Sequence, residues 1–149
     1  MRLTLKTAVK QPYKQVFSGF TRDLFLRLAP PFPRVVVERF DGCRTGDEVH
    51  IVIDALLFKQ RWTSRIVEDG TVEHDDVFRD EVYFVDEGVE LPVFLNSWQH
   101  RHSIVSTGEG SVIIDDIRFS ARWGLDLVVY PLLWLQFAYR KPIYRRVFG

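Results

Sequence analysis

The sequence has few cysteines, glycines and prolines, and it carries no net charge. Its 149 residues include one cysteine, nine glycines and seven prolines, and 20 basic residues balance 20 acidic ones. A single thiol, Cys43, cannot form a disulfide within the chain, so we expect a reducing, cytoplasmic location. The low glycine and proline content excludes collagen-like and low-complexity classes. Balanced charge removes the general electrostatic argument for nucleic acid, which we do not expect as a partner.

Hydrophobic and aromatic residues, by contrast, are abundant enough for a large core. They make up 46% and 14% of the chain, which excludes an intrinsically disordered class. A chain of this length buries roughly 70% of the surface of its unfolded form. We therefore expect one ligand-binding domain over residues 1–149.

The spacing of apolar residues predicts a strand and two short helices at the start of the chain. The first ten residues alternate as a strand, and apolar residues then recur at helical spacing over 12–18 and 21–28. Thr21 offers an N-cap to the second of these helices. Three prolines between residues 30 and 33 prevent the helix from continuing, because proline has no amide hydrogen to donate.

Beyond these prolines the periodicity changes to two and predicts an antiparallel meander. Short connections rich in glycine and aspartate separate the runs. Together with the first strand they give about six or seven strands, and their length and imperfect alternation indicate a strongly curved sheet. The predicted strands cover residues 35–40, 48–57, 61–69, 81–87, 96–106 and 111–123.

The last 25 residues predict a long C-terminal helix. Pro131 interrupts the apolar run, which is too short for the ~20 apolar residues of a membrane span, so we expect a core helix that Pro131 kinks or begins. One helical stripe is expected to face the core, and it contains Leu125, Val128, Val129, Leu132, Leu133 and Phe137.

This order of elements forms an α+β arrangement in which a curved sheet wraps the last helix. It resembles the helix-grip fold of the START/Bet v1-like (SRPBCC) superfamily, which includes polyketide cyclase/dehydrase-like and lipid-transport proteins. Residues 30–51 and 94–119 are similar to segments of small bacterial ligand-binding members. The resemblance implies a cavity for a small hydrophobic or lipid-like ligand between the sheet and the C-terminal helix.

Two histidines and one aspartate are the main candidates for chemistry. Strand alternation places His100 and His102 on one face, and Asp115 lies on the neighbouring predicted strand. A carboxylate beside an imidazole raises its pKa and fixes its tautomer, which suits acid–base catalysis or the binding of a polar ligand group. The alternative interpretation is a structural network whose hydrogen bonds are all satisfied.

The same histidine pair has the spacing of two metal ligands on one strand, as in cupins. Cupins place a glutamate a few residues after the second histidine, whereas here Glu109 follows His102 by seven positions. We therefore expect neither a metal nor a cofactor.

Aromatic residues are the candidates for the cavity wall. Trp62 and Trp98 lie on predicted strands, and Trp134 and Phe137 lie on the closing helix. The face that contains Asp86 is a further candidate for the wall.

These features predict a binder of a small hydrophobic ligand, with a cyclase- or dehydratase-like enzyme using a His/Asp pair as the alternative. A membrane-surface contact is the third hypothesis, weighed against a helix end that positive charge simply stabilises. It rests on basic and aromatic residues at the end of the chain, namely Tyr139, Arg140, Lys141, Tyr144, Arg145, Arg146 and Phe148.

Overall fold

The computed structural model describes residues 1–75 and 79–149, which form one seven-stranded sheet and three α-helices. The predicted strands and helices are all present with similar bounds. In chain order they are β1 (Arg2–Val9), α1 (Tyr13–Ser18), α2 (Arg22–Leu28), β2 (Arg34–Phe40), β3 (Glu48–Asp54), β4 (Lys59–Val72), β5 (Glu81–Glu90), β6 (Leu95–Ser106), β7 (Ser111–Ala121) and α3 (Asp126–Phe148).

The sheet is an antiparallel meander closed at one edge by the first strand. Its order is β1-β7-β6-β5-β4-β3-β2, so β1 pairs with the last strand and every other pair is adjacent in sequence. Register shifts interrupt the β2–β3, β4–β5 and β6–β7 pairings. Each such irregularity bends the strand and increases its twist, which gives the sheet its strong curvature.

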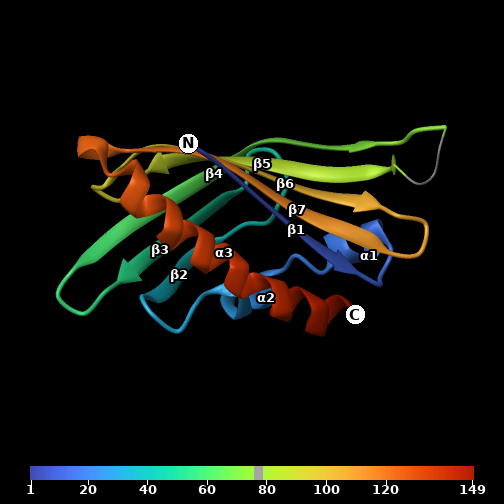
Figure 1. Cartoon of the computed structure of the whole chain (residues 1–149), viewed down its shortest axis with the longest axis horizontal. Coiled ribbons are helices and arrows are strands. Elements are labelled where there is room, and N and C mark those ends of the chain that lie inside the picture. The colour runs from blue at the N-terminus through green and yellow to red at the C-terminus, as the bar shows by residue number, and fades with distance from the viewer. Residues whose placement is uncertain (76–78) are drawn as a thin grey trace.

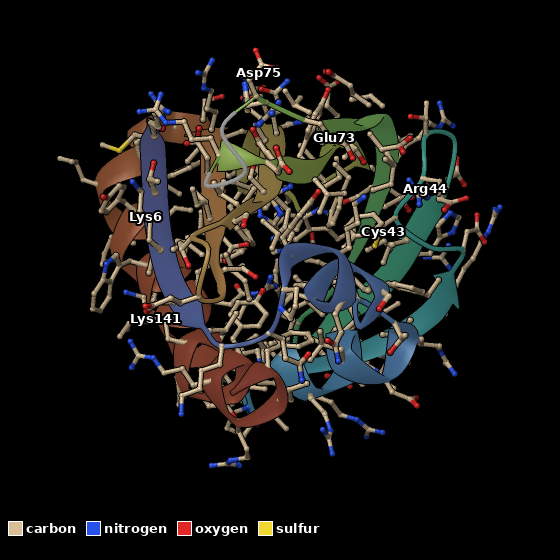
Figure 2. All side chains as sticks on the ribbon, turned by 90° about the vertical axis from the view of Figure 1, so that its right-hand side faces the viewer. Lys6, Cys43, Arg44, Glu73, Asp75 and Lys141 are labelled. Carbon is tan, nitrogen blue, oxygen red and sulfur yellow. The ribbon has the colours of Figure 1, made fainter. Side chains whose placement is uncertain are left out.

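The curved sheet wraps around α3, which crosses it diagonally (Figure 1). Viewed from the end, side chains fill the space between the β1 side and the β3 side of the sheet (Figure 2). Two groups of buried residues form the core: one lies around Trp62, Trp98 and Phe137, and the other joins α1 and α2 to the end of α3 through Tyr144 and Phe148.

The α3 helix buries a narrower stripe than the sequence predicts. Val129, Leu133 and Phe137 face the core, whereas Val128 and Leu132 are 57% and 61% exposed. A spacing of four residues keeps side chains on one face, and a shift of one residue turns them by about 100°. The helix starts at Asp126, ahead of Pro131. No helix in the described residues is long and apolar enough to span a membrane.

The basic and aromatic end of the chain is divided between the surface and the interior. Arg145 and Arg146 are exposed, but Tyr144 and Phe148 are 0% and 2% exposed and belong to the core. These two rings are therefore not free to enter a membrane interface. Of the aromatic residues predicted to contact a membrane, only Tyr139 is exposed.

Core packing around β6 predicts a large cost for truncating Leu95. This side chain is fully buried, whereas Leu57 is fully exposed. Leu95→Ala is expected to lower the free energy of unfolding by about 2–5 kcal/mol, and the control Leu57→Ala by less than about 0.5 kcal/mol. Urea denaturation measures both values, and equal effects of the two substitutions would contradict this packing.

Candidate functional site

A cavity lies between the concave face of the sheet and α3. Its volume is about 150 Å³, and β2 to β6, α2 and α3 all contribute to its wall. The wall is mostly apolar, with a small number of polar side chains, which is the usual character of a small-molecule site. Five of the seven predicted site residues line it, namely Trp62, Trp98, His100, His102 and Phe137.

The other two predicted residues lie elsewhere. Asp115 is 3% exposed and sits behind the two histidines, where it is hydrogen-bonded to both of them. Trp134 is 46% exposed and is not part of the cavity wall. It follows the inward-facing Leu133 by one residue, so the helix turns its side chain away from the core stripe. The prediction that Trp134 lines the cavity is therefore wrong.

Strand register brings the polar residues together. Across the β6–β7 pairing His102 is opposite Asp115, and across the β5–β6 pairing His100 is opposite Asp86. Because side chains two apart on a strand share a face, both imidazoles lie on the same side as both carboxylates. The predicted approach of Asp115 to the histidine pair is thus present.

One oxygen of Asp115 joins the two histidines. Its Oδ1 atom lies 2.9 Å from His100 Nε2 and 2.9 Å from His102 Nδ1. Burial alone would raise the pKa of Asp115, but the two histidines outweigh burial and hold it well below its ordinary value of 3.8. An ionised carboxylate only accepts hydrogen bonds, so both of these nitrogens carry a proton.

His100 is a cation held between two carboxylates. Its Nδ1 atom lies 3.1 Å from Asp86 Oδ2, while Asp86 Oδ1 accepts a 3.0 Å hydrogen bond from the indole nitrogen of Trp98. Burial lowers the pKa of His100, but its bonds to Asp115 and Asp86 raise it further, to about 9. The sequence places Asp86 on the cavity face, but its ion pair with His100 follows only from the β5–β6 register.

His102, in contrast, is neutral and has one free nitrogen. Burial lowers its pKa by more than Asp115 raises it, and the positive charges of His100 and Arg140 lower it further. With the proton on Nδ1, the Nε2 atom carries a lone pair, and this buried atom has no hydrogen-bond partner among the described residues. The ring is fixed between Phe20 and Phe84, with centroid distances of 4.4 and 5.0 Å.

The donor atoms of His100, His102 and Asp115 lie within 4.8 Å of one another, close enough to be considered for a metal ion. The two nitrogen–oxygen distances of 2.9 Å are hydrogen-bond lengths. Two ligand atoms on one zinc ion would lie about 3.3 Å apart. In this structure Asp115 is therefore a hydrogen-bond partner of both histidines.

Three further polar residues of the cavity come from α3 and are absent from the predicted site, namely Gln136, Arg140 and Tyr144. Arg140 and Tyr144 line the cavity beside Phe137, although their sequence surroundings predict a basic surface at the end of the chain. Their positions, three and seven residues after Phe137, continue the same helix face. The helical spacing that places Phe137 toward the core therefore also predicts that Arg140 and Tyr144 face inward. The basic residues around them in the sequence instead suggest an exposed surface.

Cys43 also lines the cavity, and its sulfur points into the space enclosed by the sheet (Figure 2). Burial, followed by the charges of Asp47 and Asp86, raises the pKa of its thiol to about 12. The thiolate is the nucleophilic form of cysteine. The thiol is therefore protonated at neutral pH and has the character of a small apolar wall residue.

Comparisons with known proteins find similarity in structure but not in sequence. No family model and no curated protein matches the chain. Norcoclaurine synthase from Thalictrum flavum has a TM-score of 0.62 at 11% identity, over 97% of this chain and 93% of that chain. The Zhui aromatase/cyclase from Streptomyces sp. R1128 has a TM-score of 0.62 at 14% identity, over 97% and 93% of the two chains.

A third structure, protein Ms6760 from Mycobacterium smegmatis, has a TM-score of 0.68 at 14% identity, over 99% of this chain and 90% of that chain. The chain has the Bet v1-like, helix-grip fold. This confirms the fold class expected from the sequence. Identities this low establish the fold and leave the chemistry to the site itself.

The ion pairs of His100 predict that stability falls as the pH rises. The folded-state pKa is about 9, against an ordinary value of 6.5, so the stabilisation is complete below pH 6.5 and is lost as the pH rises through 9. The free energy of unfolding is expected to fall by on the order of 3 kcal/mol between pH 6.5 and 10. Urea denaturation across this range measures the change.

The exposed histidine His74 provides the control for this experiment. His74→Gln should retain the pH dependence, whereas His100→Gln should flatten it. A wild-type stability that is constant or increases over this pH range would contradict the assignment of a buried imidazolium.

Proposed function

We propose that the chain binds a small apolar ligand, about the size of one aromatic ring with a short substituent, in the cavity between the sheet and α3. The observation that carries the proposal is an apolar cavity of about 150 Å³. A dry cavity of that volume lined by apolar side chains is large enough to bind benzene. Residues 1–149 would then act as one binding domain.

The character of the wall supports an aromatic or short aliphatic ligand. Trp62 and Trp98 meet edge to face, with ring centroids 4.7 Å apart, and the ring of Phe137 lies 6.2 Å from that of Trp98. Such rings offer broad apolar contact with little loss of side-chain entropy. Among similar structures, norcoclaurine synthase from Thalictrum flavum is in complex with dopamine and hydroxybenzaldehyde, both single-ring compounds.

One observation favours a second function, acid–base catalysis of the cyclase or dehydratase type. The carboxylate of Asp115 accepts a hydrogen bond from His102 Nδ1, which fixes the tautomer and orients Nε2 as a base. That nitrogen belongs to a residue of the cavity wall. A substrate with an acidic hydrogen would be deprotonated there, whereas a pure binder would release its ligand unchanged.

The four tryptophans provide a direct test of ligand binding. Trp62 and Trp98 line the cavity, whereas Trp123 and Trp134 are 72% and 46% exposed. When ethylbenzene is added to ¹⁵N-labelled protein, the indole N–H resonances of Trp62 and Trp98 are expected to shift and saturate. The signals of Trp123 and Trp134 should stay in place and serve as internal controls.

A matched pair of serine variants completes this test. Ser64 lines the cavity and Ser97 is exposed on β6. Ser64→Phe should fill the cavity and weaken ethylbenzene binding at least tenfold, and Ser97→Phe should leave the affinity unchanged. Equal shifts of all four indole signals, or an unaltered affinity in Ser64→Phe, would refute binding in this cavity.

A further inference from the structure

Three buried polar atoms around the cavity have no hydrogen-bond partner in the described part of the chain. They are His102 Nε2, Arg140 Nε and the Tyr144 hydroxyl oxygen. All three residues line the same cavity, and the side chains of His102 and Tyr144 are almost completely buried. Buried polar groups in folded proteins nearly always have a partner, and leaving one unsatisfied destabilises the fold. The three atoms therefore indicate where a ligand would place its polar group.

The chemistry of these atoms defines that polar group. The guanidinium of Arg140 is a cation that only donates hydrogen bonds, and the phenol of Tyr144 is a donor because burial raises its pKa and keeps it protonated. His102 Nε2 is an acceptor, because the proton of this ring lies on Nδ1 facing Asp115. Two donors and one acceptor match a carboxylic acid group or a primary amide. The charge of Arg140 favours the carboxylic acid, because a hydrogen bond between a guanidinium and a carboxylate is stronger than one to a neutral amide.

The charges around the cavity determine the protonation state of that group. Two carboxylates, Asp86 and Asp115, are balanced by the His100 imidazolium and the Arg140 guanidinium. A carboxylate anion alone would add an uncompensated negative charge to this buried region, which is unfavourable. A carboxylate that enters together with one proton leaves the balance unchanged.

We propose that the polar end of the cavity recognises a small apolar carboxylic acid, bound with one proton between its carboxyl group and His102 Nε2. Arg140 and Tyr144 donate hydrogen bonds to the carboxyl oxygens. The proton comes from solvent and either remains on the acid or forms the imidazolium of His102, with the same total charge. This inference rests on the proposed function and adds the chemical class of the ligand.

Neighbouring residues hold the recognition groups in place. The guanidinium carbon of Arg140 lies 4.0 Å from the centroid of the Phe137 ring, and Phe20 packs against both His102 and Tyr144. Rigid placement of donors lowers the entropy cost of binding. The aromatic or aliphatic part of the acid would lie against Trp62 and the other apolar wall residues.

Calorimetric titrations with phenylacetate and its neutral analogue phenylacetamide test the proposal. At pH 7 the acid is expected to bind at least tenfold more tightly than the amide. Titrations in two buffers with different ionisation enthalpies should show the uptake of about one proton per acid and none per amide. The affinity for the acid should fall about tenfold from pH 7 to pH 8, because the free acid and free His102 are both unprotonated there.

The other ionisable groups that face His102 change their charge by less than about a tenth between pH 7 and 8. Burial lowers the pKa of His100, but its two carboxylate partners raise it to about 9. The two histidines hold the pKa of Asp115 well below its ordinary value. Burial raises the pKa of Tyr144 and keeps its phenol protonated. The expected pH slope therefore reports on the acid and His102.

Substitutions on α3 separate recognition of the acid from filling of the cavity. Arg140→Gln is expected to remove the tenfold preference for phenylacetate and to leave phenylacetamide binding within twofold. Tyr144→Phe should weaken phenylacetate binding about tenfold while the core remains filled. Arg145→Gln removes the same charge from an exposed position on the same helix and should change neither affinity.

The outcomes distinguish this inference from the proposed function. Equal affinity for acid and amide, absence of proton uptake, or tighter binding of phenethylamine than of phenylacetate would overturn recognition of an acid and leave ligand binding intact. If ethylbenzene, phenylacetamide and phenylacetate all fail to bind, the proposed function is overturned together with this inference.

Discussion

The hydrogen bonds from two histidines to one oxygen of Asp115 are the interaction on which the site depends. They join β6 to β7 inside the core, and both nitrogens lie 2.9 Å from Oδ1. Because a buried carboxylate needs compensating charge and donors, the two rings are required for its ionised state. In return, the carboxylate fixes the tautomer of His102 and thereby determines which ring nitrogen is left as a hydrogen-bond acceptor.

Sheet curvature determines the space in which this network operates. The register shifts along β2 to β7 bend the sheet around α3. Side chains do not fill all of the space between the sheet and the helix, and a cavity remains. Trp62 and Trp98 give the resulting cavity broad apolar wall area, and His102, Arg140 and Tyr144 are among its polar wall residues. An apolar wall combined with a few fixed polar groups favours amphipathic small molecules over purely apolar ones.

Much of the sheet side of the site follows from the sequence, and much of the helix side does not. Alternation along β6 places His100 and His102 on one face, and the short β6–β7 hairpin makes Asp115 their neighbour, because strand geometry has a fixed period of two. The rotation of α3 about its axis depends on packing against the sheet. This is why Trp134 lies outside the cavity while Arg140 and Tyr144, which resemble a basic surface segment in sequence, line it.

The network requires His102 to be a neutral imidazole with its proton on Nδ1, beside a charged His100. Long-range ¹H–¹⁵N correlation spectra of the imidazole rings at pH 7 measure both states directly. We predict imidazolium-type shifts at both nitrogens of His100, and a protonated Nδ1 with an unprotonated Nε2 at His102. A neutral His100, or a His102 that carries its proton on Nε2, would contradict the account.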